Sequence, residues 1–103
     1  MTENSSYELF ITEEESIVLE AIAQSIIPYS QRAQALLAID AGSSVGQAGG
    51  VAGLRVAQVR YWIGRFRNDR LQVFPEELLK DIEVLIKERE KQDKSANKPI
   101  KKK

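Results

Sequence analysis

The sequence predicts an all-α fold, and three observations support this prediction. Apolar residues recur at helical spacing, most clearly at Val59, Trp62, Ile63 and Phe66, which share one helical stripe. Capping signals and helix breakers divide the chain at regular intervals. The only β-branched cluster, around Val73, is too short for a convincing strand. With 103 residues, the chain forms at most one domain.

The first helix is expected over 13–27. Thr12 and Glu15 form a capping box, in which each side chain accepts a hydrogen bond from the backbone N–H of the other residue. Pro28 disfavours helical geometry in the residue before it, so the helix should end there.

A second helix should begin at Ser30, whose hydroxyl can cap it, and stop at Gly42, which tolerates a left-handed conformation. A short third helix, 45–52, would open with a capping box formed by Ser44 and Gln47. Three glycines each cost this helix about 1 kcal/mol relative to alanine, so tertiary packing must hold it.

A fourth helix is expected over 56–69, after a break at Gly53. Its apolar stripe includes Trp62, which we assign to the core. A fifth helix starts near Pro75, and its apolar face stops at Lys87.

These elements suggest four parts of the chain. A flexible tail (1–11) precedes a helix-turn-helix domain (12–72). A C-terminal helix (73–92) either packs on this domain or forms a homodimer, and a disordered basic tail (93–103) follows.

Composition excludes several classes of function. The chain has no cysteine and no histidine, so disulfides, zinc fingers and thiol or imidazole catalysis are ruled out. No pattern pairs a nucleophile with a base or forms a metal cage, so we expect no enzyme, cofactor, metal or small-molecule substrate. No apolar run reaches the roughly 20 residues of a membrane span. We therefore expect a cytoplasmic protein without membrane contact, associated with the nucleoid if it binds DNA.

Charge is segregated along the chain although the net charge is zero. Residues 1–28 contain six acidic residues and no basic one, whereas residues 29–75 contain six arginines and two aspartates. A local positive surface of this kind can bind a polyanion even when the whole molecule is neutral.

The arginines of the fourth helix lie mostly opposite its apolar stripe. Arginine is always charged and can form paired hydrogen bonds with phosphate or guanine. We therefore predict contacts with DNA base edges from four residues, Gln58, Tyr61, Arg65 and Asn68. Contacts with DNA phosphates are predicted from four others, Arg55, Arg60, Arg67 and Arg70.

The segment SSVGQAGGVAGLRVAQVRYWIGRF has the pattern of a helix-turn-helix, a short helix followed by a tight turn and a longer helix. Gly53 can supply the positive φ that the turn needs, and Gly49 the small residue where the two helices cross.

These motifs, with ITEEESIVLEAIAQ and RAQALLAIDAGSSV before them, resemble the N-terminal DNA-binding region of mariner-related insertion-sequence transposases. The resemblance covers about residues 11–71. It implies a homeodomain-like helix-turn-helix bundle with an additional C-terminal helix, and double-stranded DNA as partner. The segment VRYWIGRFRNDRLQVFPEE is more faintly similar to helix-turn-helix segments that precede CHAD domains, which are associated with polyphosphate.

The sequence departs from the transposase pattern in several places. Three glycines loosen the helix over 45–52, and the usual glycine-leucine continuation into a proline- and arginine-rich linker becomes Asp69-Arg70-Leu71 and then Phe74-Pro75. Ala48 is smaller than the usual isoleucine, and Arg55 replaces a capping serine or threonine. No catalytic domain follows, so transposition is not implied. We therefore expect a small DNA-binding protein, either a transcriptional regulator or a transposase-derived helix-turn-helix. The alternatives are a protein-interaction module on this scaffold and an accessory domain that binds polyphosphate or another polyanion.

Overall fold

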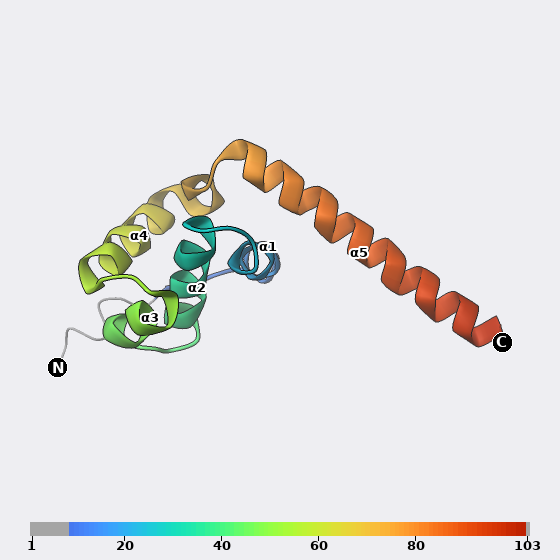
Figure 1. The fold of residues 1–103 in the computed structure, drawn as a ribbon, viewed down its shortest axis with the longest axis horizontal. Helices are drawn as coiled ribbons and strands as arrows, with labels where there is room; N and C mark the ends of the chain where they lie inside the picture. The colour runs from blue at the N-terminus through green and yellow to red at the C-terminus, as the bar shows by residue number, and fades with distance from the viewer. Residues whose placement is uncertain (1–8, 103) are drawn as a thin grey trace.

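The computed structural model describes the backbone of residues 9–102 and the side chains of residues 9–89. Over the described backbone the protein is entirely helical, which confirms the predicted all-α class (Figure 1). The elements are α1 (Glu13–Ala23), α2 (Tyr29–Asp40), α3 (Val45–Ala52), α4 (Val56–Asp69), the 3-10 turn η2 (Arg70–Val73) and α5 (Glu76–Lys102).

Helix α1 begins as predicted but ends early. The Thr12 hydroxyl accepts from the Glu15 N–H at 3.1 Å, and the Glu15 carboxylate accepts from the Thr12 N–H at 3.0 Å. The helix ends at Ala23, not near residue 27, and the N–H groups of Gln24 and Ser25 donate to carbonyls only three residues back. Side chains also bind its last carbonyls. The Ser25 hydroxyl donates to one of them at 2.7 Å. The Gln34 amide donates to the Ala23 carbonyl at 3.1 Å.

The prediction that Ser30 caps α2 is wrong. Ser30 lies inside the first turn of α2 and is buried, with 6% of its surface exposed. The helix starts one residue earlier, at Tyr29, and Pro28 occupies the N-cap position without a side-chain hydrogen bond. The Ser30 N–H already donates to the Ile26 carbonyl at 3.0 Å, so the chain turns before it reaches this serine.

The core surrounds α2, against which α1, α3 and α4 all pack (Figure 1). Helix α4 contributes Val59, Ile63 and Phe66, each at most 1% exposed, so its predicted apolar stripe is confirmed at these positions. The largest fully buried side chains of the described region are Phe66, Leu19, Ile22, Leu36, Ile63 and Val59. Since these side chains come from α1, α2 and α4, burial fixes which side of α4 faces solvent.

Residues 9–11, the described part of the tail expected over 1–11, are anchored to the fold. Residues 1–8 lie outside the described region. Leu9, however, is buried in the core with 6% of its surface exposed. The Ile11 N–H also donates to the Asp40 carboxylate at 3.3 Å, which ties the segment to the end of α2.

The connection between α3 and α4 needs glycine at two positions. Gly53 ends α3 with φ +76°, a left-handed conformation. The Leu54 N–H donates to the Gly49 carbonyl at 2.9 Å and closes the turn. A Cβ atom at Gly49 would lie 2.6 Å from the Leu54 carbonyl oxygen, closer than normal van der Waals contact allows. The predicted bounds of α3 and α4 and the capping box of α3 are confirmed.

Helix α5 packs on α1 near its start, where Ile82 is buried, and then extends away from the other helices (Figure 1). Its backbone is helical through Lys102. Apolar periodicity, which stops at Lys87, is therefore a poor guide to where this helix ends. The side chains of residues 93–103, where we expect a disordered basic tail, lie outside the described region, so that expectation stays a prediction.

Replacing Gly49 with alanine should destabilise the fold, because the new methyl group would collide with the Leu54 carbonyl oxygen. We expect Gly49→Ala to lower the free energy of unfolding by about 1–3 kcal/mol, measured by urea denaturation. Gly50→Ala is a matched control, because Gly50 is exposed and no atom lies within 4 Å of its added Cβ. This control should raise stability by up to about 1 kcal/mol. Equal stability of the two variants would contradict the proposed clash.

Candidate nucleic-acid interface

The predicted base-reading residues lie together on the solvent side of α4. Gln58, Tyr61, Arg65 and Asn68 are all exposed. The other arginines of this surface, Arg55, Arg60 and Arg67, are exposed as well. We call these seven residues the outer face of α4. They are accessible because the opposite side of the helix is held in the core.

Gln58 has a structural task at the start of α4. Its side-chain oxygen accepts a hydrogen bond from the Arg55 N–H at 2.9 Å, as the third residue of a capping box does. This bond satisfies a backbone donor at the N-cap position, where Arg55 supplies no side-chain acceptor of its own. The Gln58 amide nitrogen is the group left to donate to a base edge.

Arg65 forms an ion pair with Asp69, one helical turn away, at 2.7 Å. The two side chains are 51% and 35% exposed, so solvent screens the attraction. Exposed pairs of this kind contribute about 0–1 kcal/mol, which a phosphate or a guanine could readily replace. Asp69 therefore reduces the local positive charge without locking Arg65 in place.

Arg70, the fourth predicted phosphate contact, is partly exposed, but its guanidinium is already bound within the chain. Its guanidinium binds the Glu15 carboxylate through two hydrogen bonds, at 2.6 and 3.0 Å. It also donates to the Phe10 carbonyl at 2.7 Å and lies 4.4 Å from the centre of the Phe66 ring. Arg70 thus joins the end of α4 to the start of α1.

The same contact shifts the ionisation of both partners. The hydrogen bond from Arg70 lowers the pKa of Glu15 and outweighs the opposing effect of burial, and the Thr12 hydrogen bonds add to the decrease. In turn, the Glu15 carboxylate raises the pKa of Arg70. Both groups therefore remain charged around neutral pH and belong to the structural framework.

Arg60 and Arg67 are exposed, but each already takes part in an interaction within the chain. A phosphate bound at either arginine would have to exchange with, or add to, that interaction. Their contribution to a DNA interface is thus smaller than a count of arginines suggests.

Trp62 lies at the margin of the core and is only partly buried, so its assignment to the core holds in part. The Arg32 guanidinium from α2 lies 4.0 Å from the centre of one Trp62 ring and 5.1 Å from the Tyr29 ring. Tyr61 meets Trp62 edge to face, with ring centres 4.9 Å apart. Sequence reasoning did not identify Arg32, although its spacing of three from Tyr29 on one helix was a usable signal.

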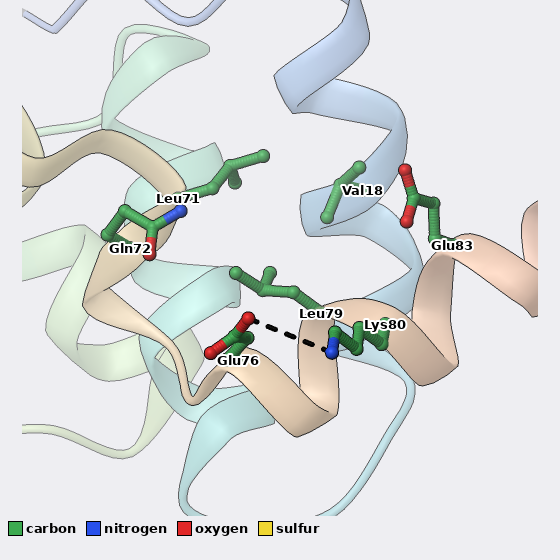
Figure 2. A pocket seen from close by; sticks show the side chains of 7 residues that line it. All are labelled: Val18, Leu71, Gln72, Glu76, Leu79, Lys80 and Glu83. Atoms are coloured by element: carbon green, nitrogen blue, oxygen red, sulfur yellow. Dashed lines mark ion pairs between the residues drawn. The ribbon is translucent and has the colours of Figure 1, made fainter.

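A pocket of about 290 Å³ lies between α1, η2 and α5 and involves no residue of α4 (Figure 2). Apolar side chains line its wall, and charged side chains lie at its edge. Among these, the Lys80 ammonium nitrogen lies 3.8 Å from a Glu76 carboxylate oxygen. The lining residues are Val18, Leu71, Gln72, Glu76, Leu79, Lys80 and Glu83. They include no hydroxyl or thiol nucleophile. Within the described residues, no three histidine, cysteine, aspartate or glutamate side chains could hold a metal ion.

Comparison with protein-family models, curated proteins and solved structures finds no match for this chain. The resemblance to transposase helix-turn-helix regions therefore remains a hypothesis. In the part of the chain that the structure describes, no helix is both long enough and apolar enough to cross a membrane.

Stability should decline as the pH falls through the folded-state pKa of Glu15. Because this pKa lies below its ordinary value of 4.5, the stabilisation is complete above about pH 4.5 and is lost at lower pH. Glu15→Gln keeps an acceptor for Thr12 but removes the charge. It should be less stable by about 1 kcal/mol near pH 7 and show a shallower acid decline, measured by thermal unfolding. Parallel pH curves for the two proteins would contradict the role of this pair.

Proposed function

We propose that this chain is a small DNA-binding protein in which α2, α3 and α4 form a homeodomain-like helix-turn-helix. The backbone features that such a unit needs support the proposal. Gly53 adopts a left-handed conformation in a tight turn, and Gly49 allows α3 and α4 to approach closely. A regulatory role and a transposase-derived origin are both compatible with this unit.

The observation that carries the proposal is the two-sided character of α4. Its apolar side is buried in the core, and its outer face is exposed and contains four arginines. Asp69, at the end of the helix, is the only acidic residue in α4. An α-helix is about 10–12 Å across with its side chains, and the major groove of B-DNA is about 12 Å wide, so α4 can lie in it.

Within this proposal, residues divide by their place on the outer face. Gln58, Tyr61, Arg65 and Asn68 read base edges, and Arg55, Arg60 and Arg67 contact phosphates. Arg60 and Arg67 would exchange their present interactions for phosphate oxygens. Arg70 has no DNA contact and instead holds α4 to α1 through Glu15.

Binding to duplex DNA should weaken steeply with salt. If Arg55, Arg60 and Arg67 each neutralise one phosphate, log affinity should fall with log salt at a slope of roughly −3. Fluorescence anisotropy of labelled duplexes, including a random-sequence pool, measures this slope. We expect Arg65→Ala to cost about 1–3 kcal/mol at a preferred base pair, whereas Arg55→Ala should weaken all duplexes alike.

Arg89→Ala is the matched control, because it removes the same charge from an exposed position on α5, outside the interface. This variant should bind DNA nearly as well as the wild type. Competition with polyphosphate tests the alternative ligand, since a polyphosphate receptor would release DNA fully at low competitor concentration. Absence of salt-dependent binding to any duplex would refute the proposed function.

A second proposal concerns protein interaction, namely a homodimer formed through α5. Val84 and Leu85 of α5 are 56% and 41% exposed. Exposed neighbouring aliphatic side chains lose contact with water if a second copy of the helix packs there. A two-fold dimer would also present two copies of α4 to DNA, as many helix-turn-helix proteins do.

We therefore expect a concentration-dependent dimer in light scattering coupled to size-exclusion chromatography. Leu85→Lys should shift the protein to monomer, because charge at a paired helix face must be desolvated. Glu83→Lys, an exposed change on a different side of α5 from Leu85, is a control for the added charge. A wild-type protein that stays monomeric at high concentration would refute the dimer.

A further inference from the structure

The geometry points to Arg32 of α2 as a further DNA-binding residue, a phosphate contact held in position by Tyr29 and Trp62. This inference rests on the proposed function and extends the interface beyond α4. Arg32 opens the segment RAQALLAIDAGSSV, but its role as a phosphate contact is inferred from the packing of α2 on α4.

Arg32 differs from the other arginines in the kind of partner it has. Arg65 and Arg70 are paired with carboxylates. Within residues 9–89, Arg32 forms no ion pair, and its identified contacts are with the faces of two aromatic rings, at 4.0 and 5.1 Å. Its positive charge is therefore not neutralised by an acidic side chain of the described region.

Stacking leaves the hydrogen-bonding capacity of this guanidinium intact. The ring faces attract the cation through their negative electrostatic potential. Unlike a carboxylate, a ring face does not occupy the guanidinium N–H donors with strong hydrogen bonds, so these donors remain available to a phosphate. An arginine side chain has many rotamers, and one already in contact with Tyr29 and Trp62 has lost part of this freedom before binding.

The position of Trp62 places Arg32 beside the proposed base readers. Gln58 precedes Trp62 by four residues and Arg65 follows it by three, so all three side chains neighbour one another along one flank of α4. Arg32 covers Trp62 on that flank. A DNA strand whose bases contact Gln58 and Arg65 of α4 would also pass close to Arg32. Arg32, which lies on α2, would then bind a phosphate of that strand.

The competing explanation is that Arg32 only shields the partly exposed Trp62 ring from water. Arg32→Met separates the two, because methionine keeps a long apolar cover over the ring and removes the charge. Arg32→Lys retains the charge, but the lysine ammonium group is not planar and cannot donate two parallel hydrogen bonds to a phosphate. A purely structural role would change stability and leave the salt slope of DNA binding untouched.

We expect Arg32→Met to bind every duplex about tenfold more weakly and to reduce the magnitude of the salt slope by about 1. Arg32→Lys should keep the wild-type slope with intermediate affinity. Arg89→Met on α5 is the matched control and should retain nearly the wild-type affinity. If the wild type binds DNA and Arg32→Met shows the same affinity and slope, this inference is wrong and the proposed function stands. If the wild type binds no duplex, the proposed function fails first.

A measurement on the unmodified protein covers the case in which Arg32→Met does not fold. Phenylglyoxal reacts with accessible arginine side chains, and mass spectrometry identifies the modified positions. Bound duplex DNA should slow the modification of Arg32 at least fivefold and leave Arg89 unaffected. Equal reaction rates of Arg32 with and without DNA would overturn the inference.

Discussion

The attachment of α4 to the core through one side is the constraint on which the rest of the structure depends. Val59, Ile63 and Phe66 are at most 1% exposed. Burial of such side chains contributes about 1.5–3 kcal/mol each, whereas an exposed ion pair such as Arg65 with Asp69 contributes about 0–1 kcal/mol. Burial of the apolar side therefore sets the rotation of α4 about its axis. The arginines on the opposite side consequently face solvent.

Charge alone does not reveal what an arginine does in this protein. Arg70 is committed to Glu15, Arg65 has a weak partner within its own helix, and Arg32 lies on aromatic rings. The Glu15 carboxylate also caps α1, so one acidic side chain both starts a helix and holds the end of another. The acidic N-terminal region and the basic middle region are thus coupled at this point through the fold itself.

Local patterns were sufficient to predict the elements and insufficient to predict partners distant in sequence. Periodicity and capping signals predicted α3 and α4, since both depend on residues a few positions apart. The pairing of Arg70 with Glu15 spans 55 positions, and no local pattern contains it. The contacts of Gln34 with the end of α1 and of Arg32 with Trp62 likewise join different helices, and no local pattern contains them.

The candidate interface is made of two helices, and this places a geometric demand on the turn between α3 and α4. Arg32 lies on α2 and Arg65 on α4, so their separation is set by how α4 packs against α2 and α3. The close contact at Gly49 sets how near the end of α3 comes to the start of α4. A side chain at that position would have to push the helices apart, which would alter the spacing of the two arginines. Since phosphates along a DNA strand are regularly spaced, the glycine that permits the turn also helps to match the protein surface to its proposed ligand.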